Sequence, residues 1–521
     1  MHVLVIAAFA LVLATPPHDP PWALVESIPT TLALITGQWM VLMSLVAIGT
    51  RMTLRRLDTV TGGEVDGLRF FARFQLVWRC LLLAVTVIAL QFTPWIGIVR
   101  DDWGLSMVYG MADLFALTPF FLGAIGAWVI QYPVDRIIRE RTVAAQLWEG
   151  QPARPVWSLK QYLGFHVRHN LLLIAAPMFG VLVLRDAEPD YRAHLTRWTG
   201  QPVSGQLAFL AGVGLIFLFS PFLLRYIWST EVLPAGELRD RLERLCSRVG
   251  LRYRQILIWQ TGGVMVNGAV MGLFAPLRYI LLSDGLLESM EDDKIEAVFG
   301  HEAGHVKHHH IPYYLAFAVL SMLIAGGVLL LLLAWLDAAD PVAEGLTGSA
   351  SRMLLAVVPD RSSYLIQVSP ILLVAVMWLV GFGWISRRFE RQADLFGALT
   401  VTPEPDHCIR DCVVHHPQDG NTTQDPHALC GTAAELFAEA LETIALLNGI
   451  NPKSRSWRHS SIAYRAAFLR RLATEPARVR TFQGVVRNIK IVLFVGTAVA
   501  LAVTVVLYLT GQLPPELVGV Y

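Results

Sequence analysis

The stretch EAVFGHEAGHVKHHH, residues 296–310, contains five histidines and two glutamates within fifteen positions. Acidic residues precede it, apolar residues recur at helical spacing, and proline is absent, so residues 286–308 are predicted to form one helix. Side chains four residues apart share a helix face, and His301 and His305 can therefore reach the same ion.

His301, Glu302 and His305 form the HExxH pattern, which is typical of zinc metallopeptidases. In such sites zinc polarises the scissile carbonyl and lowers the pKa of the attacking water, while the glutamate acts as general base. The alternative is the polar end of a helix that leaves a membrane. His309 and His310 are interpreted as interfacial polar residues and not as ligands.

A catalytic zinc needs a third protein ligand, and SRRFERQADLFGA, residues 386–398, offers candidates. Glu390 and Asp394 lie four residues apart on a second predicted helix. One carboxylate can bind the metal while the other accepts a hydrogen bond from a ligand histidine. Taken alone, this segment also fits an ordinary solvated helix.

The composition indicates a membrane protein. Hydrophobic residues make up 54% of the 521 residues, charged residues 16%, and the mean hydropathy is +0.50. The net charge of +1 gives no case for a nucleic-acid partner, which would need a clustered basic face. The five cysteines are scattered, unlike a secreted disulfide framework.

Several apolar runs are long enough to cross a bilayer. They cover residues 31–50, 75–92, 111–130, 169–184, 207–228, 313–335, 365–385 and 489–509. Residues 1–15 form either a signal peptide or a short additional span. Arginine-rich loops mark the cytoplasmic side, and alternation places residues 229–312 and 386–488 on that side as well.

These observations predict a mainly α-helical protein with a polytopic transmembrane bundle and a cytoplasmic α+β domain. The expected organisation is an N-terminal bundle of five or six spans (1–228), a first domain part (229–312), a transmembrane hairpin (313–385), a second domain part (386–488) and a C-terminal helix with its tail (489–521). Short β-rich runs at 255–260, 264–272 and 278–284 predict a small sheet. Residues 235–250 predict an amphipathic helix closed by Gly250.

The combination of HEAGH, a two-span hairpin and ERQAD resembles the membrane metallopeptidases typified by the HtpX heat-shock protease and the zinc-type CAAX prenyl protease. The resemblance covers residues 233–472 and implies a zincin-like (gluzincin) domain. It implies that His301, His305 and Glu390 bind one catalytic zinc. It also implies that Glu302 is the catalytic base and that Asp394 supports a ligand histidine.

Two further segments resemble motifs of the same family. VNGAVMG resembles an edge strand that hydrogen-bonds an extended substrate, with Asn267 and Gly268 at the binding positions and glycine in place of the usual alanine. SWRHSSIAYRAAFL resembles a His-Pro-x-x-x-x-Arg segment with Ser460 in place of proline. There His459 would stabilise the oxyanion and Arg465 would pair with a buried carboxylate. A basic amphipathic helix on the membrane surface is the alternative.

Residues 401–431 form an insertion whose part 406–431 contains three cysteines and four histidines. A second, structural zinc would fit Cys408, Cys412, Cys430 and one histidine. The interpretation favoured by the sequence is a plain flexible insertion. A cytoplasmic position argues against disulfides.

The sequence therefore favours an integral membrane zinc metalloendopeptidase that acts on protein or peptide substrates, in membrane protein quality control or in processing. One alternative is a metallopeptidase-like signalling receptor, although the outer loops are short for a sensor domain. Another is a non-catalytic scaffold or transporter with a vestigial site, although few ionisable residues lie deep in the spans.

Overall fold

The computed structural model describes residues 1–14, 23–58, 63–148, 156–200, 204–345, 372–402, 408, 412, 414–415 and 428–511. The chain divides into two compact units. The first comprises Met1–Thr230 with Gln260–Gly262, and the second comprises Glu231–Trp259 with Gly263–Tyr521. Most of the predicted insertion, the middle of the predicted hairpin and the C-terminal tail lie outside the described residues.

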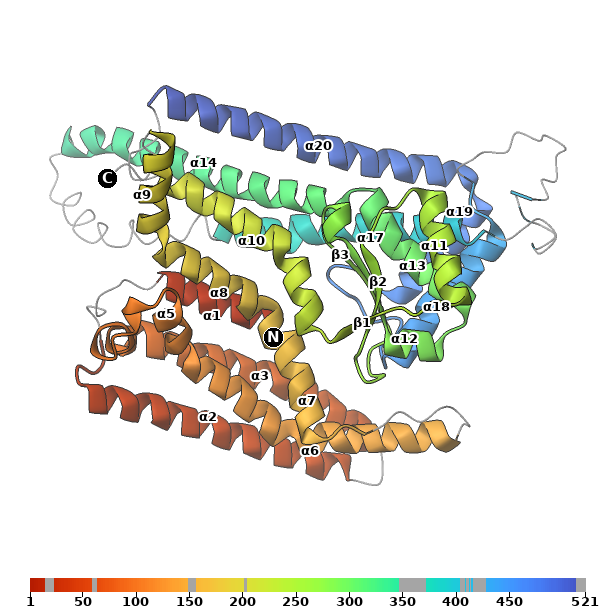
Figure 1. The fold of residues 1–521 in the computed structure, drawn as a ribbon, viewed down its shortest axis with the longest axis horizontal. Helices are drawn as coiled ribbons and strands as arrows, with labels where there is room; N and C mark the ends of the chain where they lie inside the picture. The colour runs from red at the N-terminus through yellow and green to blue at the C-terminus, as the bar shows by residue number, and fades with distance from the viewer. Residues whose placement is uncertain are drawn as a thin grey trace. The chain divides into compact units, whose positions relative to one another are not determined.

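Helices make up most of the described residues of the first unit (Figure 1). Helices are expected here because a segment in lipid must satisfy its backbone hydrogen bonds internally. The main helices are α1 (His2–Ala14), α2 (Ile28–Leu57), α3 (Gly63–Gln91), α5 (Met111–Ala116), α6 (Thr118–Trp148), α7 (Leu159–His166), α8 (Leu173–Asp186), α9 (Glu188–Thr199) and α10 (Gly205–Ile227). Asp113 is buried in this unit, where Arg100 and Arg185 pair with its carboxylate. Its charge thus has a structural role.

Seven helices among the described residues are long and apolar enough to cross a membrane, so the chain is a multi-pass membrane protein. They are Ile28–Leu57, Asp66–Gln91, Leu159–Asp186, Ala208–Ile227, His310–Leu331, Leu372–Thr400 and Pro476–Leu507. The expected run at 111–130 falls on α5 and the start of α6, which are not among the seven. The start of the run at 365–385 lies outside the described residues. The number of spans and their orientation stay predictions.

The second unit contains a four-stranded mixed sheet in the order β1-β2-β4-β3. The strands are β1 (Thr230–Val232), β2 (Gln255–Trp259), β3 (Gly268–Met271) and β4 (Tyr279–Ser283). β2 pairs with β4 in parallel, and β3 pairs with β4 antiparallel, with Gly268 opposite Leu282. The predicted small sheet is thus confirmed. β1 was missed because three residues are too few to show an alternating pattern.

The helices of the second unit pack beside this sheet, and three of them, α14, α17 and α20, belong to candidate membrane spans (Figure 1). They are α11 (Glu237–Val249), α12 (Asp284–Ser289), α13 (Asp292–Lys307), α14 (His310–Gly345), α17 (Gly383–Thr400), α18 (Gly431–Leu447), α19 (Ile462–Thr474) and α20 (Pro476–Leu509). α11 ends at Gly250, as predicted, and Gly250 adopts the left-handed conformation.

The prediction of a single helix over residues 286–308 is wrong in one respect, because the segment forms two helices: α12 ends at Ser289 and α13 begins at Asp292. Glu291 has extended backbone angles and precedes α13. The acidic residues Asp292 and Asp293 occupy the first turn of α13, where the helix dipole favours negative charge. The acids that the sequence showed early in the segment therefore mark the start of a new helix.

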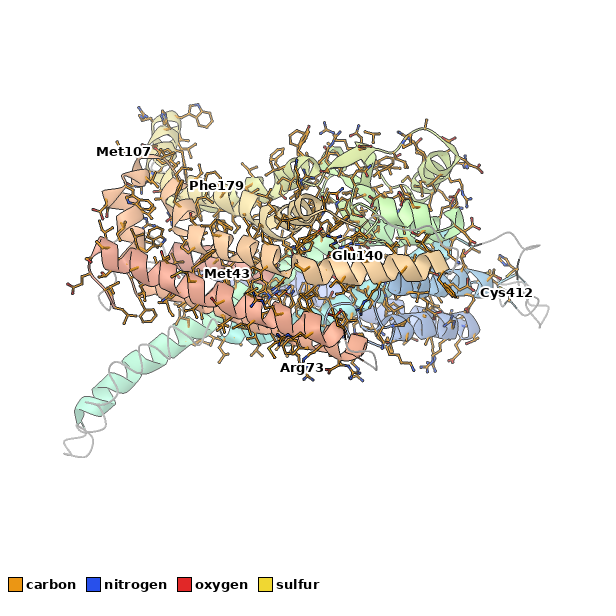
Figure 2. All side chains as sticks on the ribbon, turned by 90° about the horizontal axis from the view of Figure 1, so that it is seen from below. Met43, Arg73, Met107, Glu140, Phe179 and Cys412 are labelled. Atoms are coloured by element: carbon orange, nitrogen blue, oxygen red, sulfur yellow. The ribbon has the colours of Figure 1, made fainter. Side chains whose placement is uncertain are left out.

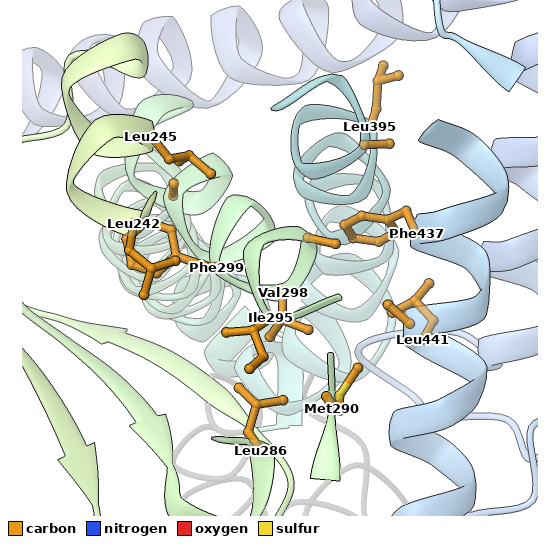
Figure 3. Close-up of a cluster of buried hydrophobic side chains, with 14 of the residues drawn as sticks. Leu242, Leu245, Leu286, Met290, Ile295, Val298, Phe299, Leu395, Phe437 and Leu441 are labelled. Atoms are coloured by element: carbon orange, nitrogen blue, oxygen red, sulfur yellow. The ribbon is translucent and has the colours of Figure 1, made fainter. Parts of the chain in front are cut away.

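An apolar core joins these elements (Figure 3). Leu242 and Leu245 of α11 pack with Phe299 of α13, and Leu395 of α17 and Phe437 of α18 complete the same cluster. Burying apolar surface contributes about 25 cal/mol per Å². The core thus fixes the mutual positions of α13, α17 and α18, which carry the residues of interest.

Glycines allow α13 and α17 to approach at backbone distance. A Cβ atom on Gly300 would lie 3.1 Å from the Cα atom of Gly397, and one on Gly304 would lie 3.0 Å from the Cα atom of Ala393. A Cβ atom on Gly397 would lie 2.8 Å from the backbone nitrogen of His301. Larger residues at this crossing would separate the two helices.

We therefore predict that Gly397→Ala destabilises the protein by about 1–3 kcal/mol, the usual cost of overpacking. Thermal unfolding of the detergent-solubilised protein would measure this. Gly484→Ala is a matched control, because a Cβ atom there has nothing within 4 Å and alanine favours a helix. Equal stability of both variants would contradict the close crossing.

Candidate metal centre

Three side chains from α13 and α17 converge on one point. Nε2 of His301 lies 3.2 Å from Nε2 of His305. Oε2 of Glu390 lies 3.6 Å from Nε2 of His301, and Oε1 lies 3.7 Å from Nε2 of His305. Zinc bound at about 2.1 Å in a tetrahedron has ligand atoms about 3.4 Å apart. The separations therefore match those of a three-residue zinc site.

A buried ion pair supports His301. Nδ1 of His301 lies 2.9 Å from Oδ1 of Asp394, which is fully buried. Arg465 donates from Nε to Oδ2 of Asp394 at 2.8 Å and from Nη2 to Oδ1 at 2.5 Å. This bidentate pair holds the carboxylate in place. A carboxylate next to Nδ1 keeps the proton on that nitrogen and leaves Nε2 available as a ligand atom.

A second chain of hydrogen bonds supports His305. The chain begins at Lys490, whose ammonium group can only donate hydrogen bonds. The side-chain atom of Gln392 that lies 2.9 Å from Nζ of Lys490 is therefore the oxygen Oε1. Nε2 of His310 lies 3.0 Å from the same oxygen and must donate to it. In a neutral imidazole Nδ1 of His310 then accepts, and Nδ1 of His305 donates to it at 2.8 Å.

This network fixes the tautomer of His305, whose Nε2 lone pair then faces His301 and Glu390. His310 is fully buried, so its interpretation as an interfacial polar residue was wrong. The reason is a turn at His309, where φ is +56°, which starts α14 and carries His310 back toward His305. Among the described residues, neither His309 nor His310 belongs to the convergent ligand set.

The donor set suits zinc, because two imidazole nitrogens and one carboxylate are common ligands of catalytic zinc. Both histidines present Nε2 to the same point, with Nδ1 of His305 hydrogen-bonded to His310 and Nδ1 of His301 beside the Asp394 carboxylate, as expected for metal ligands. Two lone pairs facing each other at 3.2 Å repel unless a cation lies between them. The residues present therefore fit a zinc ion.

Glu302 lies next to this set and also contacts the edge of the sheet. The backbone N–H of Val270 on β3 donates to its carboxylate. Burial raises the pKa of Glu302 to about 7. A Cβ atom on Gly268 would lie 3.5 Å from Cγ of Glu302 and 3.1 Å from Cγ1 of Val298. Glycine at position 268 therefore lets the edge strand approach the carboxylate.

His459 lies at the other side of Glu390. Its Nδ1 lies 2.9 Å from Oε2 of Glu390, while its side chain is 44% exposed. The next residue, Ser460, has φ of +66°. Proline cannot adopt this angle, because its ring holds φ near −65°. The departure from the His-Pro pattern therefore has a backbone reason.

A cavity of about 350 Å³ joins these groups. Its lining includes Asn267, Gly268, His301, Glu302, His305, Ile311, Tyr314, Glu390, Phe437, His459 and Arg465. Of the nine residues selected from the sequence, eight line this cavity and the ninth, Asp394, lies behind His301. The sequence missed His310 and Gln392. The only sequence signal for these two residues was the presence of a polar side chain within a largely apolar helix.

We predict that His310→Leu weakens zinc binding about 10–100-fold, the usual effect of removing a partner of a ligand histidine. Zinc competition with a chelator would measure the affinity. His309→Asn is a matched control, because His309 is exposed and asparagine tolerates its left-handed backbone. An unchanged affinity in His310→Leu would contradict the hydrogen-bond chain.

We also predict that Arg465→Leu destabilises the protein by about 3–5 kcal/mol, because it leaves Asp394 buried without its partner. Arg470→Leu provides the comparison. Arg470 pairs with Glu435 and Glu442 at the surface, where such pairs contribute about 1 kcal/mol or less. The two midpoints of thermal unfolding should differ clearly, and similar values would show that the Arg465 pair is not isolated from water.

Comparison with known proteins connects this geometry to a family. Residues 233–438 match the model of Peptidase family M48. A "Protease HtpX homolog" from Aeropyrum pernix is 30% identical over 126 residues, which cover 24% of this chain and 39% of the relative. A "CAAX prenyl protease 1 homolog" from Arabidopsis thaliana is 27% identical over 169 residues, covering 32% of this chain and 37% of the relative.

The chain thus spans less than two-fifths of the length of these curated relatives. Among solved structures, the crystal structure of S. mikatae Ste24p has a TM-score of 0.41 and 16% sequence identity, covering 85% of this chain and all of that one. The family match includes the HExxH helix, the edge strand and the helix with Glu390. Residues 233–438 are therefore similar to Peptidase family M48 over the part of the chain that carries the convergent side chains.

Proposed function

We propose that this protein is an integral membrane zinc metalloendopeptidase that hydrolyses peptide bonds of protein substrates. The observation that carries the proposal is the position of Glu302. This carboxylate lies in the same cavity as the convergent His301, His305 and Glu390, and it contacts the edge strand β3. A general base beside a zinc site and a strand edge is the arrangement that peptide hydrolysis requires.

The edge strand supplies a way to hold the substrate. Asn267 accepts a hydrogen bond from Ser283 on β4 through its backbone oxygen at 3.0 Å. Because backbone groups alternate along a strand, those of Gly268 and Val270 face away from β4, toward the cavity that both residues line. An extended peptide added along this edge would place its backbone next to Glu302.

When bound, zinc would polarise the scissile carbonyl and lower the pKa of the attacking water. Glu302 would accept the proton of that water and then transfer it to the leaving amine. A bound divalent cation also lowers the pKa of a nearby carboxyl group, which keeps Glu302 ionised as a base. His459 lines the cavity next to Glu390, where its protonated ring, with Nδ1 donating to Glu390, can donate a hydrogen bond from Nε2 to the developing oxyanion.

The cavity also indicates where substrates come from. Ile311 and Tyr314, in the first turns of the candidate span His310–Leu331, form part of its wall. A peptide in the cavity would therefore lie close to the membrane boundary. This supports membrane proteins or membrane-attached proteins as substrates, in quality control or processing. The arginine-rich loops support a cytoplasmic position of the site.

We predict that Glu302→Gln lowers proteolysis of an unfolded model protein by about 100-fold or more, because the general base is lost. Its zinc content should stay that of the parent. Glu296→Gln on the same helix is a matched control, since Glu296 pairs with Arg241. Unchanged proteolysis in Glu302→Gln would refute the proposal. Glu390→Ala should lower both zinc content and activity.

A further inference from the structure

A second group of metal-ligating side chains lies between α17 and α18. The described residues of this segment bring together Cys408, Cys412, His415 and Cys430. One ligand atom from each lies within 4.8 Å of all the others. Cys412 is labelled in Figure 2, outside the helices that carry the HExxH site. Cys412 and Cys430 are buried, and Cys408 and His415 are partly buried.

The distances fit a tetrahedral metal site. Sγ of Cys408 lies 3.3 Å from Sγ of Cys430. Nδ1 of His415 lies 3.8 Å from Sγ of Cys430 and 4.0 Å from Sγ of Cys412. Zinc bonds of about 2.3 Å to sulfur and 2.1 Å to nitrogen place two sulfur ligands about 3.8 Å apart and a sulfur and a nitrogen about 3.6 Å apart, so each separation here lies within about 0.5 Å of these values. A disulfide needs about 2.05 Å between sulfurs, so the Cys408–Cys430 contact is not a bond.

Backbone groups around the sulfurs are arranged for negative charge. The N–H groups of Val414, His415 and Gly431 donate hydrogen bonds to Cys412. Cys430 is the N-cap residue of α18, so its sulfur lies at the start of that helix. The first turn of a helix favours negative charge. Thiolates bound to a metal would satisfy these donors, whereas neutral thiols are weak acceptors.

We propose that Cys408, Cys412, His415 and Cys430 bind a structural zinc ion. The sequence interpretation favoured a plain insertion because the Cys-x-x-x-Cys spacing of Cys408 and Cys412 was placed at the edge of the usual range. Four protein ligands leave no open position, so the ion would be structural and not catalytic. The spacing of three residues between Cys408 and Cys412 lies within the range that zinc sites use.

Such an ion would stabilise one wall of the cavity. α17 carries Glu390 and ends at Thr400, and α18 begins directly after Cys430. α18 contributes Phe437 and Leu441 to the cavity, and the ring of Phe437 lies 6.3 Å from that of His301. The zinc would close the loop between these two helices, and its binding free energy would add to their stability.

Metal content of the purified full-length protein tests the proposal. The parent should contain two zinc ions per chain, and His301→Ala/His305→Ala should contain one. Cys412→Ser/Cys430→Ser should also contain one, and the two pairs combined should contain none. The control Cys80→Ser, a cysteine outside the cluster, should keep two. One ion in the parent that disappears with the histidine pair would overturn the proposal and leave the proposed catalytic site intact.

Cobalt substitution gives a readout that does not depend on activity or on the folding of the cysteine variant. The His301→Ala/His305→Ala protein loaded with Co²⁺ should show thiolate-to-metal charge-transfer absorption. His415→Cys should keep this absorption, because sulfur replaces nitrogen as the fourth ligand, whereas His415→Ala should lose the metal to a chelator. Absence of the absorption, or a Cys408–Cys430 disulfide found by peptide mapping in the parent, would overturn the proposal.

Discussion

The candidate catalytic site depends on the close approach of α13 and α17. Gly300 and Gly304 of α13 face Gly397 and Ala393 of α17 at backbone distance, which no pair of larger residues would allow. This contact places Glu390 next to Nε2 of both histidines. It also places Asp394, one turn further along α17, next to Nδ1 of His301. One helix crossing thus aligns a metal ligand and the partner of another ligand.

The charges buried at this crossing explain why a divalent cation suits the site. When all three are ionised, Glu302, Glu390 and Asp394 carry three negative charges, and Arg465 carries one positive charge, so two negative charges remain. Such an excess costs free energy in a low-dielectric interior. Zinc supplies two positive charges at the point where the histidine and glutamate ligands converge. Arg465 does not take that role, because its guanidinium is held in a bidentate pair with Asp394, and its Nη2 stays 3.9 Å from Oε2 of Glu390.

Much of this site could be predicted from local spacing. The pairs His301 with His305 and Glu390 with Asp394 each follow from a helix period. Their meeting could be expected only from the family resemblance, because no local rule joins residues that far apart in sequence. His310 was misjudged since its role depends on the left-handed turn at His309 and on Gln392 and Lys490 from other helices. Likewise, spacing alone could not choose His415 among the histidines near the three cysteines.

α17, which holds Glu390, belongs to a candidate membrane span, and α14, another candidate span, follows directly after α13 with its two histidines, so the site is coupled to the bilayer. α14 begins at His310, which supports His305, and its next turns contribute Ile311 and Tyr314 to the cavity. Lys490 of α20 reaches Gln392 and also donates to the backbone oxygen of His308. The support of His305 therefore comes from side chains on three helices that belong to candidate spans. A shift of these spans would change the hydrogen bond that orients a zinc ligand, so the membrane-embedded part of this unit is itself a component of the site.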